Sequence, residues 1–235
     1  MSKTASIQSV QIGTAQPAEP PRSADFSSRP WVTGFGKRPT SAPVLLTIEG
    51  LAGDQQADRK NHGGPDKAVC VYPAEHYPFW QTELQFEITC GGFGENLTLD
   101  GWTEADVCIG DAWQIGSARV QVSQPRQPCW KVSRWWGVKD LAARVQANGK
   151  TGWYLRVLQE GNIQQGDTIQ LLDRSAAHWT ISIANQTMHH DRTNIDAAAA
   201  LLAVPTLSAS WKQTLQRRVD AAADQSTDLR LKGSP

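Results

Sequence analysis

The chain has 235 residues, a mass of 25.7 kDa and a formal net charge of zero, because 23 basic residues balance 23 acidic ones. A chain of this length can bury one full hydrophobic core and a smaller second one. The balanced charge gives no overall field that attracts nucleic acid or an anionic membrane, so neither is expected as a partner. The N-terminus lacks the apolar stretch of a secretory signal, and no window approaches about eighteen consecutive apolar residues, so we expect a cytoplasmic protein.

Strand patterns dominate the chain up to residue 174. Alternating apolar residues predict a strand over 5–12, whereas a segment rich in Pro, Ser and Ala predicts a long surface loop over 14–42. Gly-Asp pairs beside strand patterns, among them Gly53-Asp54, predict tight turns. Further strand patterns lie at 43–51, 67–73, 95–123 and 151–173, and helical patterns lie at 138–150 and at 74–84, where Pro78 interrupts the pattern. We therefore expect a mainly β fold with a few helices.

Beyond residue 175 the sequence becomes rich in alanine and loses the strand pattern. Three helix-forming segments begin at Thr180, Asn194 and Ser208, and each of these side chains can accept hydrogen bonds at a helix N-cap. Short helices of this kind need to pack on one another or on the main body. The sequence thus predicts a β-rich domain over 1–174 and a small three-helix appendage over 175–235.

One of the four cysteines follows a stiff loop. In QVSQPRQPCW (121–130), Pro125 and Pro128 lack the N–H that a sheet ladder needs, so they predict a rigid loop that places Cys129. The cationic neighbours Arg126 and Lys131 favour the thiolate form, which ligates metals or attacks electrophiles. On these residues alone, a purely structural role for Cys129 is equally open.

Two glycine-rich segments are weaker candidates for a binding site. RKNHGGPDKAV (59–69) combines His62 with two glycines and Lys67, and the amides of such a turn can hold an anion, although a basic surface turn is the simpler interpretation. GGFGENLTLDG (91–101) places Asn96 at the mouth of a strand but matches no dinucleotide-binding fingerprint. Neither segment assigns a function by itself.

Together, the segments GD…NHGGPDKAV, FGENLT…DG and QVSQPRQPC resemble, in this order and spacing, the MOSC family, which is related to the C-terminal part of molybdenum-cofactor sulfurases. The resemblance is strongest to the YiiM-type branch, which continues VYPAEHYPFW after the HGG segment. That branch also carries a short three-helix C-terminal domain, matched here by LSASWKQTLQRR (207–218). The resemblance covers nearly the whole chain, least closely over 14–42, and implies an antiparallel MOSC-type β-barrel with a few helices.

The resemblance also implies a molybdenum cofactor (molybdopterin) and assigns roles to single residues. Cys129 corresponds to the family's conserved cysteine and is expected to be the catalytic residue and the metal ligand, since a soft thiolate suits molybdenum. The expected cofactor-binding residues are His62, Gly63, Gly64 and Lys67 of the HGG turn, near the pterin phosphate, with Asn96 near the metal and Arg126 as an anchor for cofactor or substrate.

By the same resemblance, we expect a reductase of N-hydroxylated small molecules, such as 6-N-hydroxylaminopurine-type base analogues, with a role in detoxification. Because the chain carries no nicotinamide or flavin fingerprint, an external flavoprotein reductase is the expected electron donor. Two alternatives stay open. One is sulfur transfer through a persulfide on Cys129, and the other is a carrier that binds the cofactor without turnover.

Overall fold

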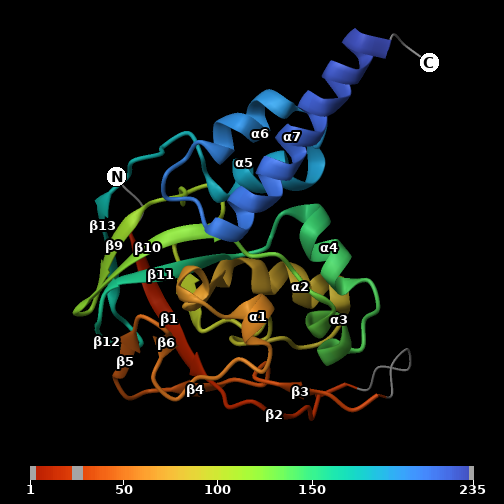
Figure 1. Ribbon diagram of the computed structural model, residues 1–235. Helices are drawn as coiled ribbons and strands as arrows, with labels where there is room; N and C mark the ends of the chain where they lie inside the picture. The colour runs from red at the N-terminus through yellow and green to blue at the C-terminus, as the bar shows by residue number, and fades with distance from the viewer. Residues whose placement is uncertain (1–3, 23–28, 233–235) are drawn as a thin grey trace.

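The computed structural model describes residues 4–22 and 29–232, and a β-barrel forms its centre (Figure 1). Among these residues, seven strands form a closed circuit in the order β13-β9-β10-β11-β7-β8-β1 and back to β13, and β4 pairs with the far half of β1. The pairing of β7 with β8 is parallel, and the other pairings of the circuit are antiparallel. The strands are β1 (Ala5–Ile12), β4 (Arg38–Thr40), β7 (Val69–Pro73), β8 (Leu97–Asp100), β9 (Ala112–Ile115), β10 (Ala118–Pro125), β11 (Trp153–Gln159) and β13 (Thr168–Asp173).

Two small sheets lie beside the barrel and change two of the predicted elements. The segment 43–51 is two strands rather than one, because a turn at 48–49 folds β5 back onto β6. The segment 14–42 is more than a surface loop, since it contributes β2, β3 and β4. The added strands are β2 (Gln16–Pro17), β3 (Val32–Thr33), β5 (Val44–Thr47), β6 (Gly50–Leu51) and β12 (Gly161–Ile163).

Strand β7 separates two hydrophobic clusters, one inside the barrel and one outside it. All five of its residues are buried, as expected for a strand with packed side chains on both faces. One face contributes Val69 and Val71 to the barrel core, where Trp113 and Trp153 are fully buried. The other face contributes Tyr72 to a second cluster, where its ring stacks on Phe93 at 4.2 Å between centroids. The site described below lies at the edge of this second cluster.

Short helices cover this side of the barrel. Pro78 lies in the first turn of α2, where its missing N–H breaks no helical hydrogen bond, and the helical segment predicted over 74–84 is divided just before it into η2 and α2. Gly149 ends α4 with φ 74°, which confirms the predicted C-terminal glycine. Helix α3 follows Cys129 directly and was not predicted. The helices are α1 (Arg59–His62), η1 (Pro65–Lys67), η2 (Ala74–His76), α2 (Tyr77–Leu84), α3 (Trp130–Trp136) and α4 (Leu141–Asn148).

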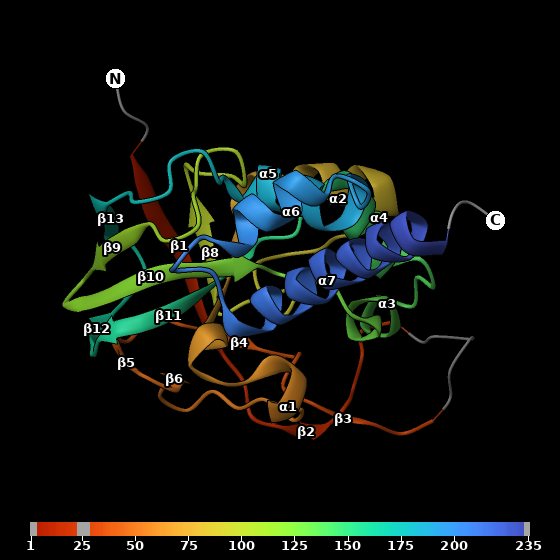
Figure 2. The ribbon, with the colours of Figure 1, turned by 45° about the horizontal axis from the view of Figure 1, so that its top comes forward.

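The C-terminal helical region consists of α5 (Ile181–Asn185), the π-helical stretch η3 (Gln186–His190), α6 (Ile195–Leu202) and α7 (Ala209–Lys232). The three predicted N-caps are confirmed, because the side-chain oxygens of Thr180, Asn194 and Ser208 each accept a backbone N–H three residues on, at 3.0–3.3 Å. The helices lie together on one side of the barrel (Figure 2), and their apolar residues belong to the same cluster as the barrel core. The domain boundary at residue 174 stays a prediction. None of the described helices combines the length and the apolarity needed to cross a membrane.

Candidate functional site

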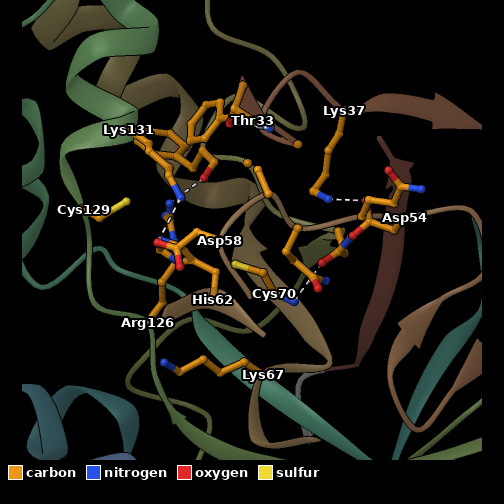
Figure 3. A pocket seen from close by; sticks show the side chains of 18 of the residues that line it. Thr33, Lys37, Asp54, Asp58, His62, Lys67, Cys70, Arg126, Cys129 and Lys131 are labelled. Atoms are coloured by element: carbon orange, nitrogen blue, oxygen red, sulfur yellow. Dashed lines mark hydrogen bonds and ion pairs between the residues drawn. The ribbon is translucent and has the colours of Figure 1, made fainter. Parts of the chain in front are cut away.

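Loops from distant parts of the sequence meet at one pocket of about 630 Å³, part of which is open to solvent (Figure 3). Its walls come from the segments 33–37, 54–58, 62–70, 93–96 and 126–131, together with Tyr154 of β11. The pocket gathers five of the predicted site residues, His62, Lys67, Asn96, Arg126 and Cys129. Three motifs that lie up to about seventy positions apart in sequence therefore form one site.

The two glycines of the HGG turn are not among the residues that line this pocket. Gly64 has φ +94°, a conformation that favours glycine, and it borders a neighbouring hollow. Gly63 borders neither hollow, but a Cβ there would lie 2.8 Å from the carbonyl oxygen of Arg59. Both glycines thus allow the tight backbone turn that carries His62 and Lys67.

Arg126 presents a buried cation to the pocket. Its backbone N–H bonds to the carbonyl oxygen of Gly152 at 3.0 Å, and its Nη2 donates to the carbonyl oxygen of Phe93 at 2.6 Å. Its Nη1 is buried and has no hydrogen-bond acceptor among the described residues. Burial by itself lowers the pKa of the guanidinium, but the neighbouring Cys70, Tyr154 and Cys129 raise it above its usual value. Arg126 therefore stays charged and keeps a buried donor for an anionic or electron-rich ligand.

Cys129 lies where the proline-bounded loop meets helix α3. Strand β10 ends at Pro125, as the sequence predicts, and Cys129 then takes the N-cap position of α3 with extended backbone angles, φ −124° and ψ 168°. Its side chain makes no capping hydrogen bond, and the residue is partly buried and lines the pocket. The thiol is thus held at the pocket wall by a backbone fixed on both sides.

His62 is electrically neutral at neutral pH. Burial lowers its pKa to about 4, and the positive charges of Lys131, Arg126 and Lys67 act in the same direction, against the opposing effect of Asp58. Burial also lowers the pKa of Lys67. Lys131 forms an ion pair with Asp58 at 3.7 Å (Figure 3). This wall of the pocket therefore combines three cationic side chains with a neutral imidazole.

On the opposite wall, the structure adds two residues that the sequence prediction missed. Lys37 forms an ion pair with Asp54, and both side chains are almost fully buried, with exposed fractions of 5% and 2%. Asp54 Oδ2 accepts a hydrogen bond from Nδ2 of Asn96 at 2.9 Å, and Oδ1 of Asn96 accepts the N–H of Cys70 at 3.1 Å. Both ends of the Asn96 amide are therefore engaged by the protein. In the sequence, Asp54 belongs to the Gly53-Asp54 pair that opens the family pattern. Taken by itself, this pair predicted only a turn.

Glu95 shapes the glycine-rich loop beside Arg126. Its carboxylate is fully buried and accepts hydrogen bonds from the backbone N–H groups of Gly91 at 2.7 Å and Phe93 at 3.0 Å. The hydroxyls of Thr98, at 2.8 Å, and Tyr77 also donate to it. These bonds fix the loop so that the carbonyl oxygen of Phe93 meets the guanidinium of Arg126.

Within the described part of the chain, no group of three or more His, Cys, Asp and Glu side chains could hold a metal ion.

The comparisons with known proteins agree with the motifs and the fold. Residues 58–170 match the MOSC domain family, and residues 179–222 match the YiiM-like, 3-alpha helix domain. YflK from Bacillus subtilis (strain 168) is 46% identical over 85% of this chain and 90% of its own length. YiiM from Escherichia coli (strain K12) is 39% identical over 79% of this chain and 84% of its own length. The chain belongs to the MOSC domain family, within its YiiM-like branch.

Solved structures of this branch share the fold. The crystal structure of YiiM from Geobacillus stearothermophilus superposes with a TM-score of 0.77 at 37% identity, over 92% of this chain and 99% of that one. YiiM from Escherichia coli gives 0.72 at 35% identity, over 80% and 90% of the two chains. These matches confirm the predicted fold class. A protein from Gibberella moniliformis (strain M3125 / FGSC 7600) named "Reductase" is 33% identical over 72% of this chain, which spans 31% of that protein's length.

Proposed function

We propose that this protein is a molybdenum-cofactor-dependent reductase that removes the hydroxyl oxygen from N-hydroxylated small molecules, such as 6-N-hydroxylaminopurine-type bases. The MOSC family is a family of molybdenum-cofactor-binding domains, and the Gibberella relative is named a reductase. The observation that carries the proposal is that the Cys129 thiol lines the same pocket as Arg126, whose buried Nη1 has no hydrogen-bond acceptor in the described part of the chain.

The donor set of the pocket fits the cofactor. A thiolate is a soft ligand suited to molybdenum, and Cys129 is the pocket thiol that is only partly buried. Burial raises the pKa of the other pocket thiol, Cys70, to about 11, which disfavours its thiolate. The pterin part of the cofactor ends in a phosphate, and Arg126 with Lys67 supplies the positive charge that an anion requires. In this proposal Cys129 holds the metal, and Arg126 and the HGG turn hold the pterin.

The proposed reaction converts R–NHOH, two electrons and two protons into R–NH₂ and water. The N–O bond breaks and its oxygen leaves as water, with the electron pair supplied by the bound cofactor. The protein must supply protons inside the pocket. Burial lowers the pKa of Lys67, which makes its Nζ a readier proton donor, whereas His62, whose pKa is lowered to about 4, is neutral and carries no proton to give at neutral pH. An external flavoprotein reductase in the cytoplasm would return the electrons.

The test compares wild type, Cys129→Ser and, as a matched control, Cys90→Ser, a partly buried thiol that does not line the pocket. The proteins are produced in a host that makes the cofactor, and reduction of N-hydroxyadenine to adenine is measured with a supplied flavoprotein reductase. We expect turnover by wild type and Cys90→Ser and almost none by Cys129→Ser. Full activity of Cys129→Ser, or no turnover by molybdenum-loaded wild type, would contradict the proposal.

The same experiment separates the two alternatives. A persulfide on Cys129 of metal-free protein, detected by mass spectrometry, would favour sulfur transfer. Stable cofactor binding without reduction of any N-hydroxylated compound would favour a carrier.

A further inference from the structure

The start of helix α7 lies beside the HGG turn and beside the end of strand β10, which leads into the loop that carries Arg126 and Cys129 (Figure 2). The N–H of Ala209, the first residue of α7, donates to Oδ2 of Asp66 at 3.0 Å. Just before it, the N–H of Ser208 donates to the carbonyl oxygen of Ser123 at 3.0 Å. Asp66 directly precedes the pocket residue Lys67, and Ser123 lies near the end of β10, which leads to Arg126 and Cys129.

Asp66 joins this helix to two strands of the barrel. Its Oδ1 accepts a hydrogen bond from Nε of Arg156 on β11 at 2.9 Å. Its carbonyl oxygen accepts the hydroxyl of Ser123 on β10 at 2.5 Å. Residue 66 is therefore fixed at three atoms by β10, β11 and α7, although it lies in a one-turn helix of only three residues.

A second chain of hydrogen bonds runs from helix α5 to Arg126. Nδ2 of Asn185 donates to Oγ1 of Thr151 at 2.8 Å, and the same hydroxyl donates to the carbonyl oxygen of Gly152 at 3.0 Å. That carbonyl oxygen also accepts the backbone N–H of Arg126 at 3.0 Å. The C-terminal helical region thus reaches the Arg126 loop by a route that does not involve Asp66.

We propose that the C-terminal helical region holds the two pocket loops in place, with Asp66 as the positioning residue that connects α7 to the HGG turn. Loops open locally more easily than the strands that carry them, and a binding site needs its side chains held near one geometry. Trp211, with an exposed fraction of 1%, anchors the first turn of α7 in the barrel's hydrophobic cluster. The helix therefore offers Asp66 a fixed partner. This role does not depend on the reaction that the pocket performs.

Ala209→Pro is the sharpest test. Proline removes the single N–H that Asp66 Oδ2 accepts, and it is well tolerated at the first position of a helix. The substitution leaves every charged group unchanged. Asp66→Asn is a second test, but it also removes a charge that raises the pKa of Lys67. Asp167→Asn is the matched control, because Asp167 also accepts a backbone N–H in a turn, that of Gln164 at 2.9 Å, and does not line the pocket.

The readout is amide hydrogen exchange, measured on the full-length protein without substrate. Loss of one hydrogen bond predicts exchange about tenfold faster within 62–70 in Ala209→Pro and Asp66→Asn, with the rates in β1, β8 and β9 unchanged. Asp66→Glu should restore much of the protection, and Asp167→Asn should leave 62–70 unaffected. Unchanged exchange within 62–70 in both test variants would overturn the proposal. Uniformly faster exchange over the whole chain would also overturn it, since that pattern marks general destabilisation. A failure of the reductase assay would affect none of these outcomes.

Discussion

Nη2 of Arg126 donates a hydrogen bond to the carbonyl oxygen of Phe93 across 2.6 Å. This bond joins the loop that carries Cys129 to the glycine-rich loop that precedes β8. The guanidinium is buried, so water competes little for the bond. Arg126 therefore stabilises the wall of the pocket and also presents a charge to it.

Replacing Arg126 with methionine should destabilise the protein and weaken anion binding. The change removes a charged donor from a buried carbonyl oxygen, which predicts a loss of about 2 kcal/mol in the free energy of unfolding. Urea denaturation measures this loss. Arg126→Lys keeps the charge and should lose less. Wild-type stability in Arg126→Met would show that the bond to Phe93 contributes nothing.

Glu95→Gln tests the carboxylate that organises the glycine-rich loop. In the wild type, both carboxylate oxygens of Glu95 accept hydrogen bonds. Gln keeps the size of Glu but replaces one of these oxygens with an N–H₂ group, which cannot accept them. At least one buried donor is left without an acceptor, so we expect a loss of about 3 kcal/mol in the free energy of unfolding. Thermal and urea unfolding should agree on the direction. A change of less than about 0.5 kcal/mol, the range of ordinary surface substitutions, would argue against this role.

The buried pair Lys37–Asp54 and the exposed pair Arg59–Glu49 allow a matched comparison. Lys37→Met leaves the carboxylate of Asp54 buried without its cation, which predicts a loss of about 3–5 kcal/mol. Arg59→Met breaks a pair whose side chains are 71% and 79% exposed, and it should change stability by less than about 1 kcal/mol. Equal effects of the two changes, measured by urea unfolding, would contradict the importance of burial at Lys37.

The pKa of His62 predicts a dependence of stability on pH. Its pKa is about 4 in the folded protein and 6.5 in the reference state, so the folded chain binds fewer protons between these values. The contribution of His62 to stability is therefore complete above pH 6.5 and decreases as the pH falls towards 4. His189, whose pKa burial also lowers to about 4, acts in the same window, so His62→Gln should remove only part of the slope. NMR titration of the His62 imidazole checks the pKa directly, and a value near 6.5 would contradict the burial of this side chain.

Much of the barrel could be predicted from the sequence because its signals are local. Alternation over 5–12 and the apolar run before Pro73 became β1 and β7, and the N-cap residues marked where α5 to α7 begin. Only the family resemblance predicted that the three motifs form one site, because it assigns all three to the same cofactor. The residues alone gave no distance between Cys129 and the HGG turn.

The missed features depend on contacts between distant residues. Lys37 lies in a segment with loop composition, and only the folded chain shows that Asp54 is its partner and that Asn96 also bonds to Asp54. The role of Asp66 was equally invisible, since its partner Ala209 lies 143 positions away. The parallel pairing of β7 with β8 also depends on topology, because a strand pattern does not record the direction of its neighbour.

The molybdenum content of the purified protein tests the central claim most directly. Wild type and Cys90→Ser, produced in a host that makes the cofactor, should each carry about one molybdenum per chain, as expected for a single site with one protein ligand. Cys129→Ser should carry far less, because the hydroxyl of serine is a poor substitute for a thiolate ligand to this metal. Equal molybdenum in wild type and Cys129→Ser, or none in wild type, would contradict the assignment of Cys129 as the metal ligand.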